Sequence, residues 1–206
     1  FRRVHETHPD LKLVLCGEEP DAALRAVISE HGLADAVICR GAVSTDELLN
    51  LYQHAQLFAL PSLQEGLGIV VLEALACGTP VVAFESGGPS GIVIDGETGR
   101  LLPDPRNSAA YAQAILDLLD DPQALEAMRA RCVGHARRTY DLPVITGRIR
   151  AAYDELLNDT PDLPLRAWLA AGWAVLVAAA YGLNLFQRHW PAIQSQIIGP
   201  LLGSLR

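Results

Sequence analysis

The sequence predicts an α/β fold built on a parallel sheet, and three observations support this prediction. Short apolar runs rich in β-branched residues alternate with segments whose apolar residues recur at helical spacing. Glycine, proline and helix-capping residues separate these segments. The 206 residues, of which 50% are hydrophobic and 19% charged, are enough for one domain with a sizeable core and a short appendage.

Residues 1–60 follow this alternation. Strands are expected at residues 11–17, 35–39 and 56–60. Helices are expected at residues 1–10, 21–32 and 44–55. Gly17 ends the first strand, and Pro61 follows the third. Ser44 and Glu47 have the spacing of a capping box, which marks the start of the third helix. This is the order of β-α-β units, in which successive strands run parallel.

Residues 61–157 continue the pattern. Strands are expected at residues 80–84 and 92–94. Helices are expected at residues 71–78, 107–119, from 121 onward, and 143–157. Gly78 closes the first of these helices, while Asp121 and Pro122 provide an N-cap and a first helical residue. Two glycine-rich turns flank the short strand at 92–94.

Charge and cysteine content exclude several kinds of partner. The 16 Lys and Arg against 24 Asp and Glu give a net charge of -8, and the chain has no dense basic cluster, so nucleic acid is not an expected partner. The cysteines lie far apart without a Cys-x-x-Cys pair, which predicts free thiols in a reducing cytoplasm. We expect no metal and no other cofactor.

The stretch 61–103 carries the chemistry that the sequence predicts. Gly66 and Gly68 precede a helix, so its first backbone N–H groups are open to a phosphate, which the helix dipole also favours. Glu65 precedes this helix, and Glu73 lies about 9 Å along its axis from Leu67 at ~1.5 Å per residue. Carboxylates on both sides of a diphosphate can accept hydrogen bonds from sugar hydroxyls. Because loops gather at the carboxyl ends of parallel strands, both glycine-rich loops are expected to line one crevice.

The motif EGLGIVVLEALACGTPVV at residues 65–82, with PS upstream and GG and DGETG downstream, resembles a known family. It is similar to the donor-binding domain of retaining glycosyltransferases with two Rossmann-like domains, family 4. The resemblance covers residues 1–157. It implies a single Rossmann-like domain, which is the donor half of a GT-B fold. It also implies an enzyme that transfers a hexose from a nucleoside diphosphate sugar to an acceptor.

The resemblance also implies roles for individual residues. Glu65 is expected to contact the donor sugar as the catalytic carboxylate, and Glu73 to bind the ribose hydroxyls of the nucleotide. The backbone is expected to bind the diphosphate and sugar at Gly66, Leu67 and Gly68, and the base near Arg40 and Gly41. For Gly87 and Gly88, a simple chain turn and close approach of the ligand both fit the pattern. In this family the new glycosyl bond forms on the same face, with no protein nucleophile required.

The sequence departs from the family pattern in three ways. Gly17 is followed by Glu18 and Glu19 where a second glycine is common, which adds negative charge near an expected phosphate loop. Gly91 stands where an acidic residue usually follows the glycine pair. The usual first strand, with its basic residues, and the acceptor domain are expected upstream of Phe1, where the chain looks cut in mid-helix. Two other interpretations stay open: half of a sugar-nucleotide epimerase, or a non-catalytic donor-binding or membrane-anchored partner module that lacks the acceptor domain.

The C-terminal part differs in composition. We expect a nucleotide-sugar-binding domain at residues 1–157, a linker at 158–164 and a hydrophobic segment at 165–206. Residues 168–186 carry no charge, and their number is close to the roughly 20 that a membrane-spanning helix needs. A membrane helix and an alanine-rich helix docked on the domain both fit this stretch. We therefore expect a cytoplasmic protein, held at the cytoplasmic face of a membrane if this helix inserts.

Overall fold

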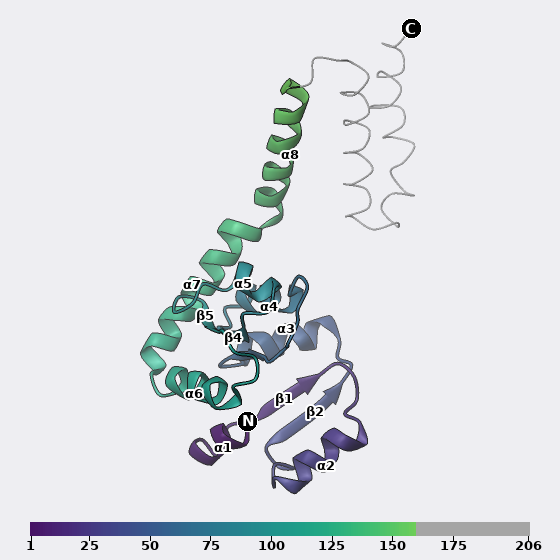
Figure 1. The fold of residues 1–206 in the computed structure, drawn as a ribbon, viewed down its shortest axis with the longest axis vertical. Helices are drawn as coiled ribbons and strands as arrows, with labels where there is room; N and C mark the ends of the chain where they lie inside the picture. Colours follow the sequence, from purple (N-terminus) through teal and green to yellow (C-terminus); the bar gives the residue numbers. More distant parts are fainter. Residues whose placement is uncertain (160–206) are drawn as a thin grey trace. The chain divides into compact units, whose positions relative to one another are not determined.

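The computed structural model describes residues 1–159. The contacts divide the chain into two units, Phe1–Asp141 and Leu142–Arg206. In the second unit the structure describes one helix, α8 (Leu142–Asp159), drawn in green in Figure 1. The predicted linker at 158–164 falls almost entirely outside the described residues, and the predicted membrane helix at 168–186 does so completely. Among residues 1–159, no helix is both long enough and apolar enough to cross a membrane.

The first unit alternates helices and strands along the chain (Figure 1). Its strands are β1 (Leu13–Cys16), β2 (Val37–Gly41), β3 (Phe58–Leu60), β4 (Val81–Phe84) and β5 (Gly99–Leu102). Its first helices are α1 (Arg2–Thr7), α2 (Ala22–Glu30), α3 (Thr45–His54) and α4 (Ile69–Ala76). They are followed by α5 (Gly88–Ile92), α6 (Ser108–Leu119) and α7 (Pro122–Tyr140).

Side-chain caps begin several of these helices where the sequence predicted them. Ser44 Oγ accepts a hydrogen bond from the Glu47 N–H at 3.2 Å, so the helix after Ser44 starts as expected. Asn107 and Asp121 cap α6 and α7 in the same way, each accepting a backbone N–H bond of 2.9 Å. These bonds satisfy donors that a helix otherwise leaves unpaired.

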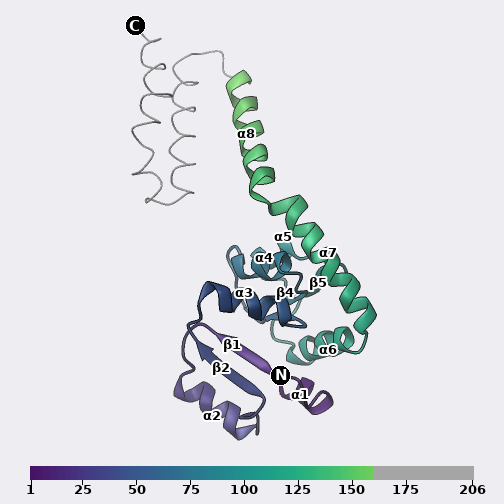
Figure 2. The same ribbon diagram turned by 180° about the vertical axis from the view of Figure 1, so that it is seen from behind.

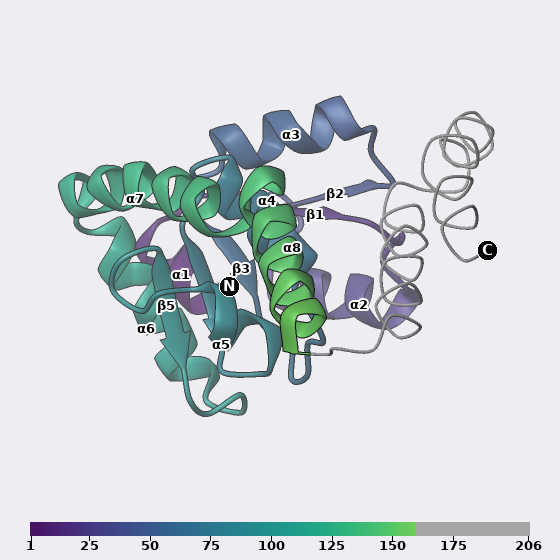
Figure 3. The same cartoon turned by 90° about the horizontal axis from the view of Figure 1, so that it is seen from above.

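Every strand pair is parallel, which confirms the predicted α/β class. The described strands form two sheets rather than one: β1 pairs with β2, and β3, β4 and β5 pair in that order. β1 and β2 lie side by side in Figures 1 and 2. All four residues of β4 are buried, as expected for the central strand of a parallel sheet. Helix α6 packs on β4 and β5, and Figure 3 shows it beside β5.

The predicted strand at residues 92–94 is wrong. The short helix α5 runs up to Ile92, and Val93 and Ile94 lie outside any helix or strand. The helix forms because Pro89 supplies a helical φ at its start, and it ends where the Val93 N–H donates to the Pro89 carbonyl at 2.9 Å. Two side chains from α7 bind carbonyls of this helix: Tyr140 donates to the Gly91 oxygen at 2.8 Å, and His135 Nε2 lies 2.9 Å from the Ile92 oxygen. These long-range contacts favour the helix over the strand that β-branched residues predict.

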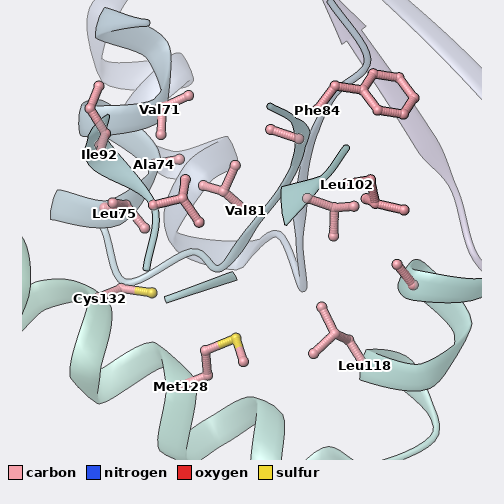
Figure 4. Close-up of a cluster of buried hydrophobic side chains, with 14 of the residues drawn as sticks. Val71, Ala74, Leu75, Val81, Phe84, Ile92, Leu102, Leu118, Met128 and Cys132 are labelled. Atoms are coloured by element: carbon pink, nitrogen blue, oxygen red, sulfur yellow. The ribbon is translucent and has the colours of Figure 1, made fainter. Parts of the chain in front are cut away.

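The core lies between α4, β4 and α7. Figure 4 shows Leu75 of α4 and Val81 of β4 together with Met128 and Cys132 of α7. Leu75, Val81 and Cys132 are each 0% exposed. The Cys132 thiol also donates to the backbone oxygen of Thr98 at 3.4 Å. This packing holds α4, which begins at the predicted site, firmly against the sheet.

A long-range contact fixes the end of α3. The Arg129 guanidinium of α7 donates to the backbone oxygens of Gln53 and Ala55, each at 2.8 Å. These carbonyls belong to the last turn of α3 and to its C-cap, where a helix leaves its acceptors unpaired. Arg129 therefore ties α3 to α7 close to Tyr52, whose side chain reaches the predicted site.

Candidate functional site

The loops that follow β3 and β4 meet at the carboxyl ends of these strands. The Glu65 N–H donates to the Ser86 oxygen at 3.0 Å, and the Gly88 N–H donates to the Glu65 oxygen at 3.0 Å. Glu65 and Gly87 form an isolated parallel bridge, so the pairing of β3 with β4 resumes between the loops. The structure thus brings together the two glycine-rich loops that the sequence placed in one crevice.

Gly87 and Gly88 allow this close approach. Gly87 has a φ of +84°, and a Cβ there would lie 2.5 Å from the Glu65 oxygen. A Cβ on Gly88 would collide with the Leu67 backbone and lie 2.9 Å from the Gly66 oxygen. The sequence left two explanations for these glycines, a chain turn and close approach of a ligand. The structure adds a third, since the absence of side chains at Gly87 and Gly88 makes room for the backbone of the neighbouring loop.

The first turn of α4 presents free backbone donors. Gly68 is its N-cap, in the left-handed region at φ +75°, and it has no side chain to cap the helix. The N–H groups of Ile69 and Val70 make no hydrogen bond to any residue that the structure describes. These two donors and the helix dipole make this end of α4 suited to an anion.

Glu65 contacts the same turn. Its Oε1 accepts a hydrogen bond from the Gly68 N–H at 3.2 Å, so one of the amides predicted to bind the diphosphate is already paired. Gly66 differs from its neighbours, because a Cβ there would meet nothing within 4 Å and its φ is not positive. The fold itself therefore places no requirement for glycine at position 66.

Glu73 lies in α4 beside α3. The Tyr52 hydroxyl donates to Glu73 Oε2 at 3.2 Å, and Tyr52 is only 7% exposed. Burial raises the pKa of Tyr52 well above its ordinary value, and the Glu73 carboxylate raises it further, so the hydroxyl keeps its proton.

Arg40 and Gly41 lie at the carboxyl end of β2. Arg40 is exposed, and its Nη1 lies 3.9 Å from Glu47 Oε1. Gly41 has a φ of +62°, and its oxygen accepts the Gly17 N–H at 2.9 Å. No hydrogen bond or ion pair between described residues joins Arg40 or Gly41 to Glu65 or Glu73. Their predicted role at the base stays a prediction.

Two polar groups at the site had not been predicted. Tyr52 is one, because its spacing in α3 is that of an ordinary core residue and only the fold brings it to Glu73. Ser86 is the other: its buried Oγ has no hydrogen-bond partner among the residues that the structure describes. A serine directly before a glycine pair was the only sequence signal, and it is a weak one.

The fold and the site together define a class of protein. Parallel strands whose carboxyl ends carry two glycine-rich loops, one of them leading into a helix with free N–H groups, form a Rossmann-like domain. The family model described as "Glycosyl transferases group 1" matches residues 1–139. The chain belongs to this family, which confirms the resemblance seen in the sequence.

Individual relatives agree with this assignment. The D-inositol 3-phosphate glycosyltransferase of Paenarthrobacter aurescens is 40% identical over 130 residues, which are 62% of this chain and 32% of that protein. The chain thus spans about a third of the length of the curated relatives that it matches.

Solved structures show the same fold, that of GT-B glycosyltransferases. Sucrose-phosphate synthase from Thermosynechococcus elongatus aligns with a TM-score of 0.67 and 29% identity, over 77% of this chain and 42% of the synthase. Anabaena Alr3699/HepE, solved in complex with UDP, aligns with a TM-score of 0.65 and 26% identity, over 71% of this chain and 42% of its own.

Proposed function

We propose that this chain binds the nucleoside diphosphate sugar of a retaining hexosyltransferase and acts as its donor half. The pairing of the loop at Glu65 with the loop at Gly87 and Gly88, directly beside the free N–H groups of α4, is the observation that carries this proposal. The family match favours a transferase over the epimerase interpretation. The acceptor domain is supplied by polypeptide outside this chain.

The contacts suggest how the donor is held. The N–H groups of Ile69 and Val70 face the diphosphate, and the open space at Gly66 lets a phosphate or sugar approach the backbone. Glu65 turns from the Gly68 N–H to accept sugar hydroxyls, which frees that amide for the donor. Glu73 accepts hydroxyls of the ribose, since a carboxylate is an acceptor that suits a diol.

The proposed reaction needs no protein nucleophile. The bond between the anomeric carbon and the leaving phosphate oxygen breaks, and the acceptor oxygen bonds to that carbon on the same face. The acceptor's proton passes to the leaving phosphate oxygen. Within this chain, Glu65 and the backbone N–H groups position the donor and stabilise the charge that develops on the diphosphate. The expectation that no metal or other cofactor takes part stays a prediction.

Donor binding is the direct test of this proposal. We expect the purified chain to bind at least one sugar nucleotide from a panel of uridine, guanosine and adenosine diphosphate sugars, with saturation in a calorimetric titration. We expect the affinity to be modest, because Arg40, the cation among the predicted site residues, already lies 3.9 Å from the Glu47 carboxylate. A folded chain that binds no member of the panel would contradict the proposal.

The two carboxylates are expected to recognise different parts of the donor. Glu65→Gln should weaken binding of the sugar nucleotide more than binding of the bare nucleoside diphosphate, whereas Glu73→Gln should weaken both. Each lost hydrogen bond to a charged group corresponds to about 1.5–3 kcal/mol of binding free energy.

Glu97→Gln serves as the matched control for this comparison. It removes the same charge from the exposed turn before β5, at the opposite end of the strands from the site, and should change neither affinity. If the Glu65 and Glu73 variants lose affinity for both ligands in equal proportion, the assignment of sugar to one and ribose to the other is incorrect.

A further inference from the structure

Tyr52 is held in place at three points. Its backbone oxygen accepts a hydrogen bond from Thr79 Oγ1, which is fully buried. Its ring packs edge-on against Phe58 of β3, with 5.5 Å between ring centroids. Its hydroxyl donates to Glu73 Oε2 at 3.2 Å. A side chain restrained by backbone, ring and hydroxyl contacts provides a rigid donor for the carboxylate of α4.

This hydrogen bond gives the two carboxylate oxygens of Glu73 different surroundings. A tyrosine hydroxyl that keeps its proton has one hydrogen to donate, and Oε2 accepts it. The other oxygen, Oε1, accepts no hydrogen bond from residues 1–159, and the glutamate is only half-buried. A glutamate side chain otherwise samples several rotamers, whose loss on binding opposes association. With Oε2 held, the carboxylate is preorganised to offer Oε1 to a ligand.

We propose that Tyr52 is a positioning residue, which holds the Glu73 carboxylate so that its free oxygen meets the ribose hydroxyls of the donor nucleotide. This inference rests on the proposed function, because it assigns the partner of Glu73. A purely structural role for the hydroxyl makes a different prediction. Loss of a contact that only stabilises the core weakens all nucleotides alike, whereas loss of a positioning contact weakens only nucleotides that carry ribose hydroxyls.

The experiment compares ribose with dideoxyribose. UDP, GDP and ADP are each titrated into the full 206-residue chain, and the tightest binder is compared with its 2′,3′-dideoxy form. For the wild type we expect a clear preference for the ribonucleotide. For Tyr52→Phe we expect about a tenfold loss for the ribonucleotide, close to the lower end of the range for a hydrogen bond to a charged group, and no loss for the dideoxy form.

Tyr111→Phe is the matched control. Tyr111 is also buried in the same core, and its hydroxyl donates to the Val82 oxygen at 2.7 Å, away from the carboxylates. We expect this variant to keep the wild-type ratio of ribonucleotide to dideoxynucleotide affinity. A double variant, Tyr52→Phe with Glu73→Gln, should lose no more ribose preference than Glu73→Gln alone, because both changes remove the same interaction.

The possible outcomes distinguish the positioning role of Tyr52 from the proposed donor binding. Equal losses for both nucleotides in Tyr52→Phe overturn the positioning role but leave donor binding intact. Absence of binding by the wild type for all three nucleotides overturns the proposed function and this inference with it. Should Tyr52→Phe fail to fold, Glu73→Asp tests the same contact, since it withdraws the carboxylate from Tyr52 by one methylene. An unchanged ribose preference in that variant overturns the positioning role.

Discussion

Gly88→Ala is expected to reduce donor binding at least about tenfold and to lower the free energy of unfolding by roughly 1–3 kcal/mol, the usual cost of overpacking. The added Cβ collides with the Leu67 backbone and comes within 2.9 Å of the Gly66 oxygen. Backbone cannot swing aside as a flexible side chain can. The loop at 66–68 must therefore move away from the loop at 87–88, which removes the amides of α4 from their place.

Gly91→Ala provides a sharp control, because both glycines belong to α5. A Cβ at Gly91 meets nothing within 4 Å, and its φ is not positive. Alanine also favours a helix over glycine by ~1 kcal/mol, so stability should stay unchanged or rise. Thermal denaturation and calorimetric titration of both variants measure the two effects. Wild-type affinity in Gly88→Ala would show that contact between the loops is unimportant for the site.

Leu75→Ala is expected to lower the free energy of unfolding by about 2–5 kcal/mol, the range for deleting a large buried aliphatic side chain. Leu75 is 0% exposed and faces the core between α4, β4 and α7 (Figure 4). Its removal leaves a cavity that the surrounding well-packed side chains fill only in part. Urea denaturation followed by circular dichroism gives the difference directly.

Leu24→Ala makes the same chemical change at a surface position. Leu24 is 41% exposed on α2, so its loss should cost much less than the loss of Leu75. Similar destabilisation by the two variants would mean that the core between α4 and α7 does not carry the stability of the first unit.

The fold class and most helices could be predicted because their signals are local. Ser44, Asn107 and Asp121 cap helices through atoms three residues away, and such short-range contacts leave a clear pattern in the sequence. The strand expected at 92–94 failed for the opposite reason. Its residues favour a strand, but His135 and Tyr140, more than forty positions later, bind the Ile92 and Gly91 carbonyls of a helix that ends at Ile92.

In the candidate site, too, features within one segment could be predicted and contacts between distant segments could not. The spacing of Glu65 and Glu73 around a glycine-rich helix start could be recognised, because one continuous segment carries it. Contacts between segments could not. Nothing in the sequence indicates that Gly88 packs on the Leu67 backbone or that Tyr52 donates to Glu73. These contacts depend on the order of the strands and on the packing of α3 against α4.

The burial of Cys132 gives this protein its own chemical reporter of unfolding. Burial raises the pKa of the Cys132 thiol to about 12, although Arg129 and Arg131 lower it in part. Alkylating reagents attack the thiolate, so near neutral pH the folded protein shields Cys132 both by access and by ionisation. Cys16 is exposed and lacks the first of these protections. The rate at which Cys132 is alkylated therefore measures how often the core between α4 and α7 opens, and no cysteine has to be introduced for the measurement.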